Sequence, residues 1–376
     1  MPEDVTLLAL KELLNIVVER EGSDLYITEG VPPAVKVDGK INMIGTRKLQ
    51  SNEVEAFART VLAGSAWPKF IEMMEANIPL YFPELGRFRV NVFRQKGEVG
   101  MVIRLIKTKI PTLDQLELPK VVKSLSLKRR GLILIVGGTG EGKSTTMASM
   151  VEHYSSNSQG HIVTVEDPIE FLHEHKKCLV TQREVGIDTE SLEVALKNSL
   201  RQAPDLIVIG EIRDRNTMEA AITFAETGHL CLSTLHCANA SQAMERIINF
   251  FPAEQHKQIF MQLSMNLKAV ISQRLINSTN GGRVPAVEVL IDSPRIKDLI
   301  LNSQINEIKE TIEKSSVLEM QTFDQALYDL YRRGRISLDE ALRNADSANN
   351  LRLKIKLEGS SSLSRQKSSG VAVKRN

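Results

Sequence analysis

The sequence has few cysteines, a small net charge and no long apolar run. The chain has three cysteines, Cys178, Cys231 and Cys237, and none belongs to a C-x-x-C pair, so we expect buried, reduced thiols. No stretch approaches the roughly 20 apolar residues of a membrane-spanning helix. The N-terminus lacks the basic region and cleavage site of a signal peptide. We therefore expect a protein that stays in the cytosol.

The charge balance argues against a broad nucleic-acid-binding surface. Formal net charge is only +2, and charged residues make up 25% of the chain, as in ordinary globular proteins. A local basic patch stays open as an alternative. At 376 residues the chain is too long for one compact core, so we expect two domains and a connector.

What the sequence does contain is a nucleotide-binding motif. An unbroken apolar run at 132–136 predicts a buried strand, and the next eight residues fit G-x-x-x-x-G-K-[ST]. Glycines let successive backbone N–H groups wrap a phosphate, and the following helix presents its positive N-terminus to the same anion. A chance match in a glycine-rich turn is the alternative, which the flanking strand and helix disfavour. We expect the phosphates to be bound by Gly137, Gly138, Thr139, Gly140, Glu141, Gly142, Lys143, Ser144 and Thr145.

Acidic residues follow two further apolar runs. The predicted strand at 161–165 ends in an acidic segment that contains Glu166 and Glu170, and the run at 206–209 ends at Glu211, a Walker B pattern. Carboxylates at the C-terminal ends of strands beside a P-loop strand lie where open α/β sheets bind ligands. These side chains are therefore candidates for catalysis and for Mg²⁺ binding.

Two histidines, His229 and His236, frame a fourth apolar run at 230–235. A single histidine is more often structural than catalytic. Two histidines around one strand of the same predicted sheet favour a function.

The first hundred-odd residues predict a small α+β domain. A helix is expected over 7–18, a hairpin turn at Asp38-Gly39, and a half-solvated antiparallel strand over 87–93, where polar and apolar residues alternate. Arg89 and Arg104 lie on the polar phase of the predicted strands. A solvated face is the simpler interpretation of these arginines.

The remaining segments carry weaker patterns. Residues 109–128 predict a linker with a short helix, and from Pro252 onward we expect mostly helix. The last segment, 359–376, is polar and serine-rich, so we expect it to be disordered. Capping boxes predict helix starts at Asp114, Thr322 and Ser337.

The nucleotide-site segments together resemble the secretion ATPase superfamily that drives type II secretion and type IV pili. They match, in order, its Walker A (GGTGEGKST), Asp box (162–171), Walker B (200–214) and His box (225–236). Residues 23–39 are similar to its PAS-like domain, so the resemblance extends to about residue 358. Without the cysteine pairs and length of the assembly ATPases, the chain is identified as a member of the retraction branch, the PilT/PilU family.

Within that branch the chain is most similar to the PilU type. Where the PilT type has a characteristic segment, this chain has PRIKDLILNS at 294–303. Ala203, where most relatives have aspartate, and the ending at 344–358 point the same way. The implied organisation is a PAS-like N-terminal α+β domain (1–110), a linker (111–129), a RecA-like P-loop ATPase domain with C-terminal helices (130–358) and a tail (359–376).

The resemblance also implies a mechanism for ATP hydrolysis with Mg²⁺. Ser144 and Glu211 would act at the metal, and Glu170 is the first candidate for the water-activating base, with Glu166 nearby. His229 and His236 would couple the nucleotide state to a subunit contact. Transition-state charge would be stabilised by Arg89 and Arg104.

The implied assembly is a homohexamer at the cytoplasmic face of the inner membrane. Its expected partners are a PilT-type retraction ATPase and the inner-membrane platform protein of the pilus, with no nucleic acid. A self-sufficient PilT-type motor is one alternative to an accessory role. A RecA-like nucleic-acid motor is another, but we find no basic groove with aromatic residues of the kind it requires.

Overall fold

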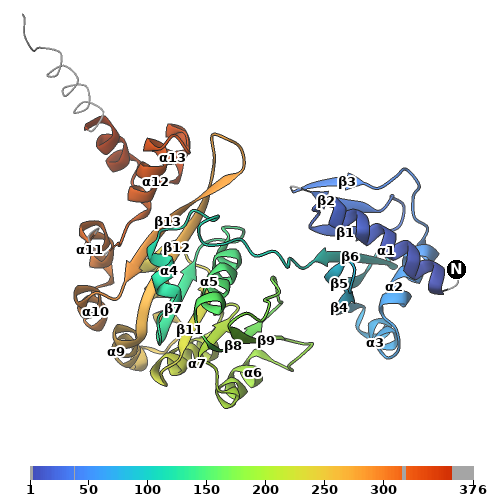
Figure 1. The fold of residues 1–376 in the computed structure, drawn as a ribbon, viewed down its shortest axis with the longest axis horizontal. Helices are drawn as coiled ribbons and strands as arrows, with labels where there is room; N and C mark the ends of the chain where they lie inside the picture. Colours follow the sequence, from blue (N-terminus) through green and yellow to red (C-terminus); the bar gives the residue numbers. More distant parts are fainter. Residues whose placement is uncertain (1–2, 38, 316–318, 358–376) are drawn as a thin grey trace, which may run out of the picture. The chain divides into compact units, whose positions relative to one another are not determined.

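The computed structural model describes residues 3–37, 39–315 and 319–357, which form two compact units (Figure 1). The first unit comprises the chain up to Lys109 together with the short segment Ile169–Leu172. The second comprises Ile110–Pro168 and the chain from His173 onward. Asp38 of the expected hairpin and the predicted tail at 359–376 lie outside the described residues.

The first unit is built on a six-stranded antiparallel sheet with the strand order β3-β2-β1-β6-β5-β4. Apolar side chains from the sheet and from α1 and α2 form one core around Leu14, Phe57 and Phe88. This is the expected α+β domain. Its elements are α1 (Glu3–Glu19), β1 (Asp24–Ile27), β2 (Ala34–Val37), β3 (Lys40–Met43), α2 (Ser51–Val61), α3 (Ala66–Met73), β4 (Glu75–Phe82), β5 (Gly86–Gln95) and β6 (Glu98–Leu105).

The second unit contains a seven-stranded sheet with the order β13-β12-β7-β11-β10-β8-β9. All its neighbouring strands run parallel except β12 and β13. Its strands are β7 (Gly131–Val136), β8 (Gly160–Glu166), β9 (Cys178–Glu184), β10 (Leu206–Ile209), β11 (Leu230–Leu235), β12 (Leu267–Asn277) and β13 (Arg283–Ile291).

Helices cover both faces of this sheet, which explains why its central strands are apolar on both sides. Ile133 and Ile135 of β7 pack with α4 and α5, whereas Leu132 and Leu134 pack with the helices of the opposite face. The helices and short 3-10 turns are α4 (Val121–Ser126), α5 (Lys143–Asn157), α6 (Leu192–Ser199), η1 (Leu200–Gln202), α7 (Arg215–Glu226), α8 (Ala240–Asn249), η2 (Ala253–Gln255), α9 (His256–Asn266), α10 (Pro294–Leu301), η3 (Ile305–Glu307) and α11 (Ile308–Lys314). The expected RecA-like α/β architecture is confirmed.

The chain after Pro252 is mostly helical, as expected, but the long strands β12 and β13 form an antiparallel hairpin within it that was not predicted. Their residues alternate too weakly, and are too buried on both faces, for a clear strand pattern. The segment 111–129 contains a short helix, α4, and its Leu113 and Val122 pack into the core of the second unit.

Two of the three predicted helix starts are confirmed. Thr322 caps α12 (Phe323–Arg332) in a full capping box, and the Ser337 hydroxyl caps α13 (Leu338–Asn344). The capping box predicted at Asp114 is wrong: reciprocal bonds join Thr112 and Gln115 instead, while Asp114 pairs with Lys123.

The cysteines are free thiols, as expected, but not all are buried. Cys178 and Cys231 are buried, whereas Cys237 is only partly covered. Burial raises the pKa of the Cys237 thiol to about 11, so the thiol stays protonated and poorly nucleophilic near neutral pH. Among the described residues, no helix combines the length and apolar character that crossing a bilayer requires.

His173 gives the second unit a pH-dependent stability. Its Nδ1 atom is buried and has no hydrogen-bond partner among the described residues, and burial lowers the pKa of the imidazole to about 4. Below pH 6.5 the imidazole is therefore protonated in the unfolded chain, whereas in the folded chain it stays neutral down to about pH 4. We expect the free energy of unfolding to fall by about 1.4 kcal/mol for each unit by which the pH is lowered between these two pKa values.

His173→Phe removes this titration, so its free energy of unfolding should depend less on pH than that of the wild type between pH 6.5 and 4. Chemical denaturation followed by circular dichroism at several pH values measures the difference. Above pH 7.5 His173 is neutral in both states, so the two proteins should there show parallel curves. Parallel curves at acid pH as well would contradict the assignment.

Candidate nucleotide site

The P-loop lies between the end of β7 and the start of α5, where close backbone contacts explain two of its glycines. A Cβ atom at Gly137 would lie 2.6 Å from the carbonyl oxygen of Gln273 on β12. Gly142 precedes α5 with a φ of +83°, and a Cβ there would lie 2.7 Å from the Gln273 side chain. Larger residues are therefore excluded at both positions.

Lys143 is the first residue of α5, and the residue is buried, with 8% of its surface exposed. Its Nζ atom donates to the carbonyl oxygens of Gly137 at 3.0 Å and Gly138 at 2.8 Å. The same atom lies 3.5 Å from Nδ1 of His236. Lys143 thus connects the P-loop to the end of the neighbouring strand β11.

A series of charged contacts continues from Lys143 along the carboxyl edge of the sheet. His236 Nε2 lies 3.1 Å from Glu211, which follows β10, and Glu211 accepts from Arg213 at 2.7 Å. Arg213 in turn donates to Asp167, which follows β8, at 3.3 Å. These contacts bring the Walker A, His box, Walker B and Asp box segments together.

The partners of His236 fix its tautomer. An ammonium group only donates and a carboxylate only accepts, so Nδ1 must accept from Lys143 while Nε2–H donates to Glu211. Burial and the positive charge of Lys143 lower the pKa of His236, against the opposing effect of Glu211. A neutral imidazole at physiological pH is consistent with both hydrogen bonds.

Glu166 and Glu170 occupy different environments although both belong to the Asp box. Glu166 is 9% exposed and accepts hydrogen bonds from Thr164 at 2.7 Å and Gln182 at 3.3 Å. Glu170 is exposed and lies in the segment Ile169–Leu172, which belongs to the first unit. In that unit Leu172 donates its backbone N–H to the carbonyl of Lys107 at 3.2 Å.

His229 lies at the opposite end of β11 from His236. Its carbonyl accepts from Gly131 at 3.0 Å, where β7 begins, whereas the P-loop follows the end of β7. The six residues of β11 span about 20 Å. Within one chain, His229 is therefore not brought together with Lys143.

Arg89 and Arg104 are direct cross-strand partners on β5 and β6 of the first unit, so they share one face of its sheet. Arg104 donates to Asp24 at 2.7 Å, and Asp24 is 2% exposed. The Arg104 side chain is itself 63% exposed, so the simpler interpretation of a solvated face stands, although its partner Asp24 is buried.

Strands β12 and β13 support the P-loop through contacts that the sequence did not predict. Gln273 is buried and accepts a hydrogen bond from the buried Thr146 of α5 at 2.6 Å. The backbone N–H of Leu275 donates to the Glu141 carboxylate, and Arg283 donates to the carbonyl of Gly140 at 3.3 Å. No local signal reveals these contacts, because each joins residues more than 120 positions apart.

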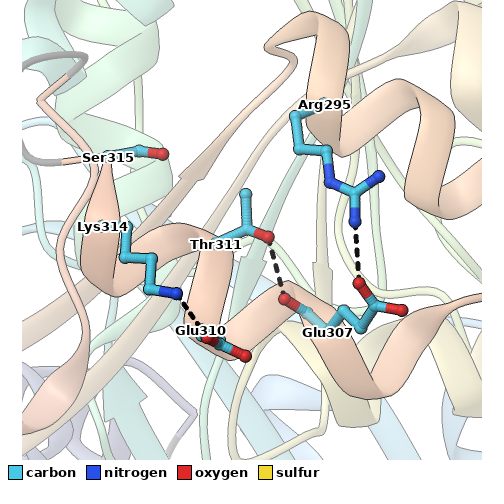
Figure 2. Close-up of a pocket in the computed structure, with 6 residues that line it drawn as sticks. All are labelled: Arg295, Glu307, Glu310, Thr311, Lys314 and Ser315. Atoms are coloured by element: carbon cyan, nitrogen blue, oxygen red, sulfur yellow. Dashed lines mark hydrogen bonds and ion pairs between the residues drawn. The ribbon is translucent and has the colours of Figure 1, made fainter.

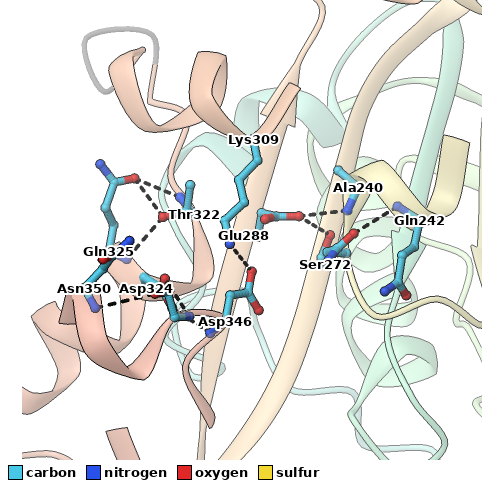
Figure 3. A network of polar contacts seen from close by, with 12 residues as sticks. Ala240, Gln242, Ser272, Glu288, Lys309, Thr322, Asp324, Gln325, Asp346 and Asn350 are labelled. Carbon is cyan, nitrogen blue, oxygen red and sulfur yellow. Dashed lines mark hydrogen bonds and ion pairs between the residues drawn. The ribbon is translucent and has the colours of Figure 1, made fainter. Parts of the chain in front are cut away.

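A buried carboxylate on β13 fixes the helix that follows the His box. Glu288 accepts from the backbone N–H of Ala240, the first residue of α8, at 2.8 Å and from Ser272 at 3.1 Å (Figure 3). Burial raises the pKa of Glu288, which these hydrogen bonds partly oppose. The start of α8, four residues after His236, is thereby anchored to the β12–β13 hairpin.

This donor set fits a bound polyphosphate. Gly138, Thr139 and Gly140 are exposed, the loop leads into the N-terminus of α5, and a lysine ammonium lies within it. Ser144, one residue after Lys143, is partly exposed and supplies the hydroxyl that Mg²⁺ requires in such loops. Glu211 contributes a carboxylate that His236 and Arg213 hold in place.

A family model and several known proteins are similar to this chain. A family model described as type II/IV secretion system protein matches residues 75–366. The type IV pilus ATPase PilU of Pseudomonas aeruginosa is 51% identical over 348 residues, which cover 92% of this chain and 91% of that protein. The retraction ATPase PilT of the same organism is 40% identical, over 89% of this chain and 98% of its own length.

A solved structure is similar as well. The crystal structure of the pilus retraction motor PilT with bound ADP has a TM-score of 0.83 and 39% identity, and covers 89% of this chain and 96% of its own.

Gln273 should be a positioning residue for the P-loop. We expect Gln273→Ala to weaken ATP binding several-fold, because the loop loses the side chain and the Thr146 hydroxyl loses its acceptor. The buried, unpaired hydroxyl should also cost about 1–3 kcal/mol of the free energy of unfolding. Fluorescent-nucleotide titration and denaturant unfolding measure the two effects.

Gln258→Ala, at an exposed glutamine of α9, is the matched control and should change neither quantity. Combined with Thr146→Val, Gln273→Ala should cost less than the sum of the two single changes, since they share one hydrogen bond. Unchanged nucleotide affinity in Gln273→Ala would refute the positioning role.

Proposed function

Because this chain belongs to the type II/IV secretion system protein family, we propose that it is an ATPase motor that powers the retraction of type IV pili. Its similarity to PilU and PilT, both of which match it over nearly their whole length, supports this activity. We propose further that it works as a PilU-type accessory to a PilT-type motor.

The observation that carries the proposal is the series of contacts from Lys143 through His236 and Glu211 to Arg213 and Asp167. It links four strand ends beside one P-loop. A bound γ-phosphate would compete with the carbonyl oxygens of the loop for the Lys143 ammonium. A shift of the Lys143 ammonium toward the phosphate would then alter its contact with His236 and, through His236, the position of Glu211. Phosphate binding would in this way affect residues along the carboxyl edge of the sheet.

Each residue of the site has a proposed task in hydrolysis. The P-loop backbone and Lys143 position the phosphates, and Ser144 and Glu211 hold Mg²⁺, which neutralises phosphate charge when bound. Glu166, which is nearly buried and already hydrogen-bonded, is proposed to orient the neighbouring Asp box residues.

Glu170 is the proposed base that accepts a proton from the attacking water. It is exposed and belongs to the first unit, although Pro168, two residues earlier, belongs to the second. Glu170 thus lies next to the point where the chain passes from the second unit to the first.

The remaining site residues are proposed to act in a homohexameric ring. Arg89 and Arg104, paired on one sheet face of the first unit, would stabilise the charge that develops on the transferred phosphoryl group. His229, about a strand's length from the P-loop of its own chain, would sense the nucleotide state at a subunit contact.

The accessory role rests on the segment 294–303, most of which forms α10. Arg295 of α10 pairs with Asp298 and with Glu307, and a cavity of about 400 Å³ lies between α10 and α11 (Figure 2). This polar surface is proposed to face the inner-membrane platform protein of the pilus, at the cytoplasmic face of the membrane. Its different sequence from the PilT type would leave hydrolysis intact and alter the coupling to retraction.

We expect Glu170→Gln to keep ATP affinity and to lower turnover by about 10²–10⁴-fold, because a general base acts mainly in the transition state. Lys143→Ala should fold normally and lose turnover altogether. Steady-state ATPase rates and nucleotide titration of the purified protein measure both effects.

Glu174→Gln is the matched control, since Glu174 is exposed four residues further on and belongs to the second unit. It should retain wild-type turnover. If Glu170→Gln instead lost ATP binding and kept its rate per bound nucleotide, its assignment as the base would be wrong.

In cells, the chain should not retract pili alone but should add force to a PilT-type motor. In a strain without its PilT-type motor, pilus retraction measured by optical trapping should be absent whether or not this protein is expressed. When the PilT-type protein is present with its P-loop lysine replaced, this chain should restore retraction, and its own Lys143→Ala variant should not. Robust retraction by this chain alone would show a self-sufficient motor.

A further inference from the structure

Strand β12 makes two kinds of contact, on opposite faces, at residues 273–275. Gln273 and the backbone N–H of Leu275 contact α5 and the P-loop, as described above. Successive side chains of a strand point to opposite faces of a sheet, so the Arg274 side chain lies on the other face. Its guanidinium carbon lies 3.9 Å from the centre of the Phe323 ring of α12. A shift of Arg274 would therefore also move the two neighbouring residues that contact the P-loop and α5.

The charged partner of Arg274 is Asp346, which lies between α13 and the C-terminal helix at 348–357. Arg274 donates to the Asp346 carboxylate at 2.8 Å and to the carbonyl oxygen of Asn344 at 2.7 Å. The Asp346 side chain is 11% exposed, and its backbone N–H donates to Asp324 of α12 at 2.8 Å. Water and salt screen such a partly buried ion pair much less than an exposed one. Asp346 therefore holds the Arg274 guanidinium in place.

The second carboxylate oxygen of Asp346 connects α11 to the same pair. Lys309 of α11 lies with its ammonium 2.9 Å from that oxygen (Figure 3). Burial raises the pKa of Asp346, but the hydrogen bonds and charges of Lys309 and Arg274 lower it further, so the carboxylate stays charged near neutral pH. One carboxylate thus joins a cation of α11 to a cation of β12.

We propose that Asp346 is a positioning residue for the P-loop. It holds Arg274, and through Arg274 the part of β12 that supports the loop, and it connects this support to α11 through Lys309. Coupling between two sites is reciprocal, so the position of α11 affects ATP affinity and ATP binding affects α11. The inference rests on the proposed function in one respect, namely that the P-loop binds ATP.

The first test measures the ATP affinity of the full-length protein by fluorescent-nucleotide titration. Asp346→Asn keeps the shape of the side chain and removes the charge, so we expect the dissociation constant to rise about three- to tenfold. In steady-state kinetics the loss should appear in KM and not in kcat, because Asp346 contributes to positioning and not to the transition state. Arg274→Gln should show the same loss, and the double variant should lose no more than either single variant.

Asp292→Asn is the matched control. The Asp292 side chain is 16% exposed and pairs with another cation of β12, Lys268, at 3.0 Å. Lys268 lies near the opposite end of β12 from residues 273–275. We therefore expect Asp292→Asn to lose stability comparably in denaturant unfolding and to bind ATP like the wild type.

Equal ATP affinities of Asp346→Asn and Asp292→Asn, whether both normal or both reduced, would overturn this inference and leave the proposed function standing. A wild-type protein that bound no ATP would overturn both.

The second test concerns the connection to α11 and uses Lys309→Met. The Lys309 side chain is 44% exposed, so this change does not put folding at risk. We expect a non-hydrolysable ATP analogue to slow amide hydrogen exchange in α11 of the wild type by at least about twofold. The analogue should have no such effect in Lys309→Met or in Asp346→Asn. An ion pair with a purely structural role would give no response to nucleotide. The same response in Lys309→Met as in the wild type, or none in the wild type, would overturn the connection.

Discussion

The parallel register of β8, β10, β11 and β7 is the constraint on which the nucleotide site depends. Parallel strands end at the same edge of a sheet, so the residues that follow these four strands meet there, although 93 positions separate Lys143 from His236. The strands are apolar because both faces are covered, which holds them in the interior of the sheet. Lys143, His236, Glu211 and Asp167 are the residues brought together in this way.

Opposite charges then join these neighbouring residues in a series of contacts. Lys143 and Arg213 supply positive charge, Glu211 and Asp167 supply negative charge, and the neutral His236 both accepts and donates between them. Hydrogen bonds to charged groups are the stronger ones, and they strengthen further in a partly buried site. These contacts join the four strand ends into one network of charged and polar groups.

The β12–β13 hairpin supports this arrangement from the other side of the P-loop. Gln273 restricts Gly137 and Gly142 sterically, and Glu288 anchors the helix that follows His236. The hairpin also carries the small core that holds the C-terminal helix. Nucleotide binding, the His box and the small C-terminal core therefore share one structural element, even though their residues are far apart in sequence.

The sequence by itself determined the local features. The P-loop, the acidic strand ends, the α/β class and the capping of α12 follow from short patterns, because glycine geometry, apolar runs and capping side chains act within a few residues. Only the tertiary structure decided which of these features meet. The position of His229 at the far end of β11, the placement of Glu170 with the first unit, the pairing of β12 with β7 and the role of Gln273 all depend on contacts across more than 20 residues. Such pairings leave no local pattern, because their stability comes from burial and register in the folded sheet.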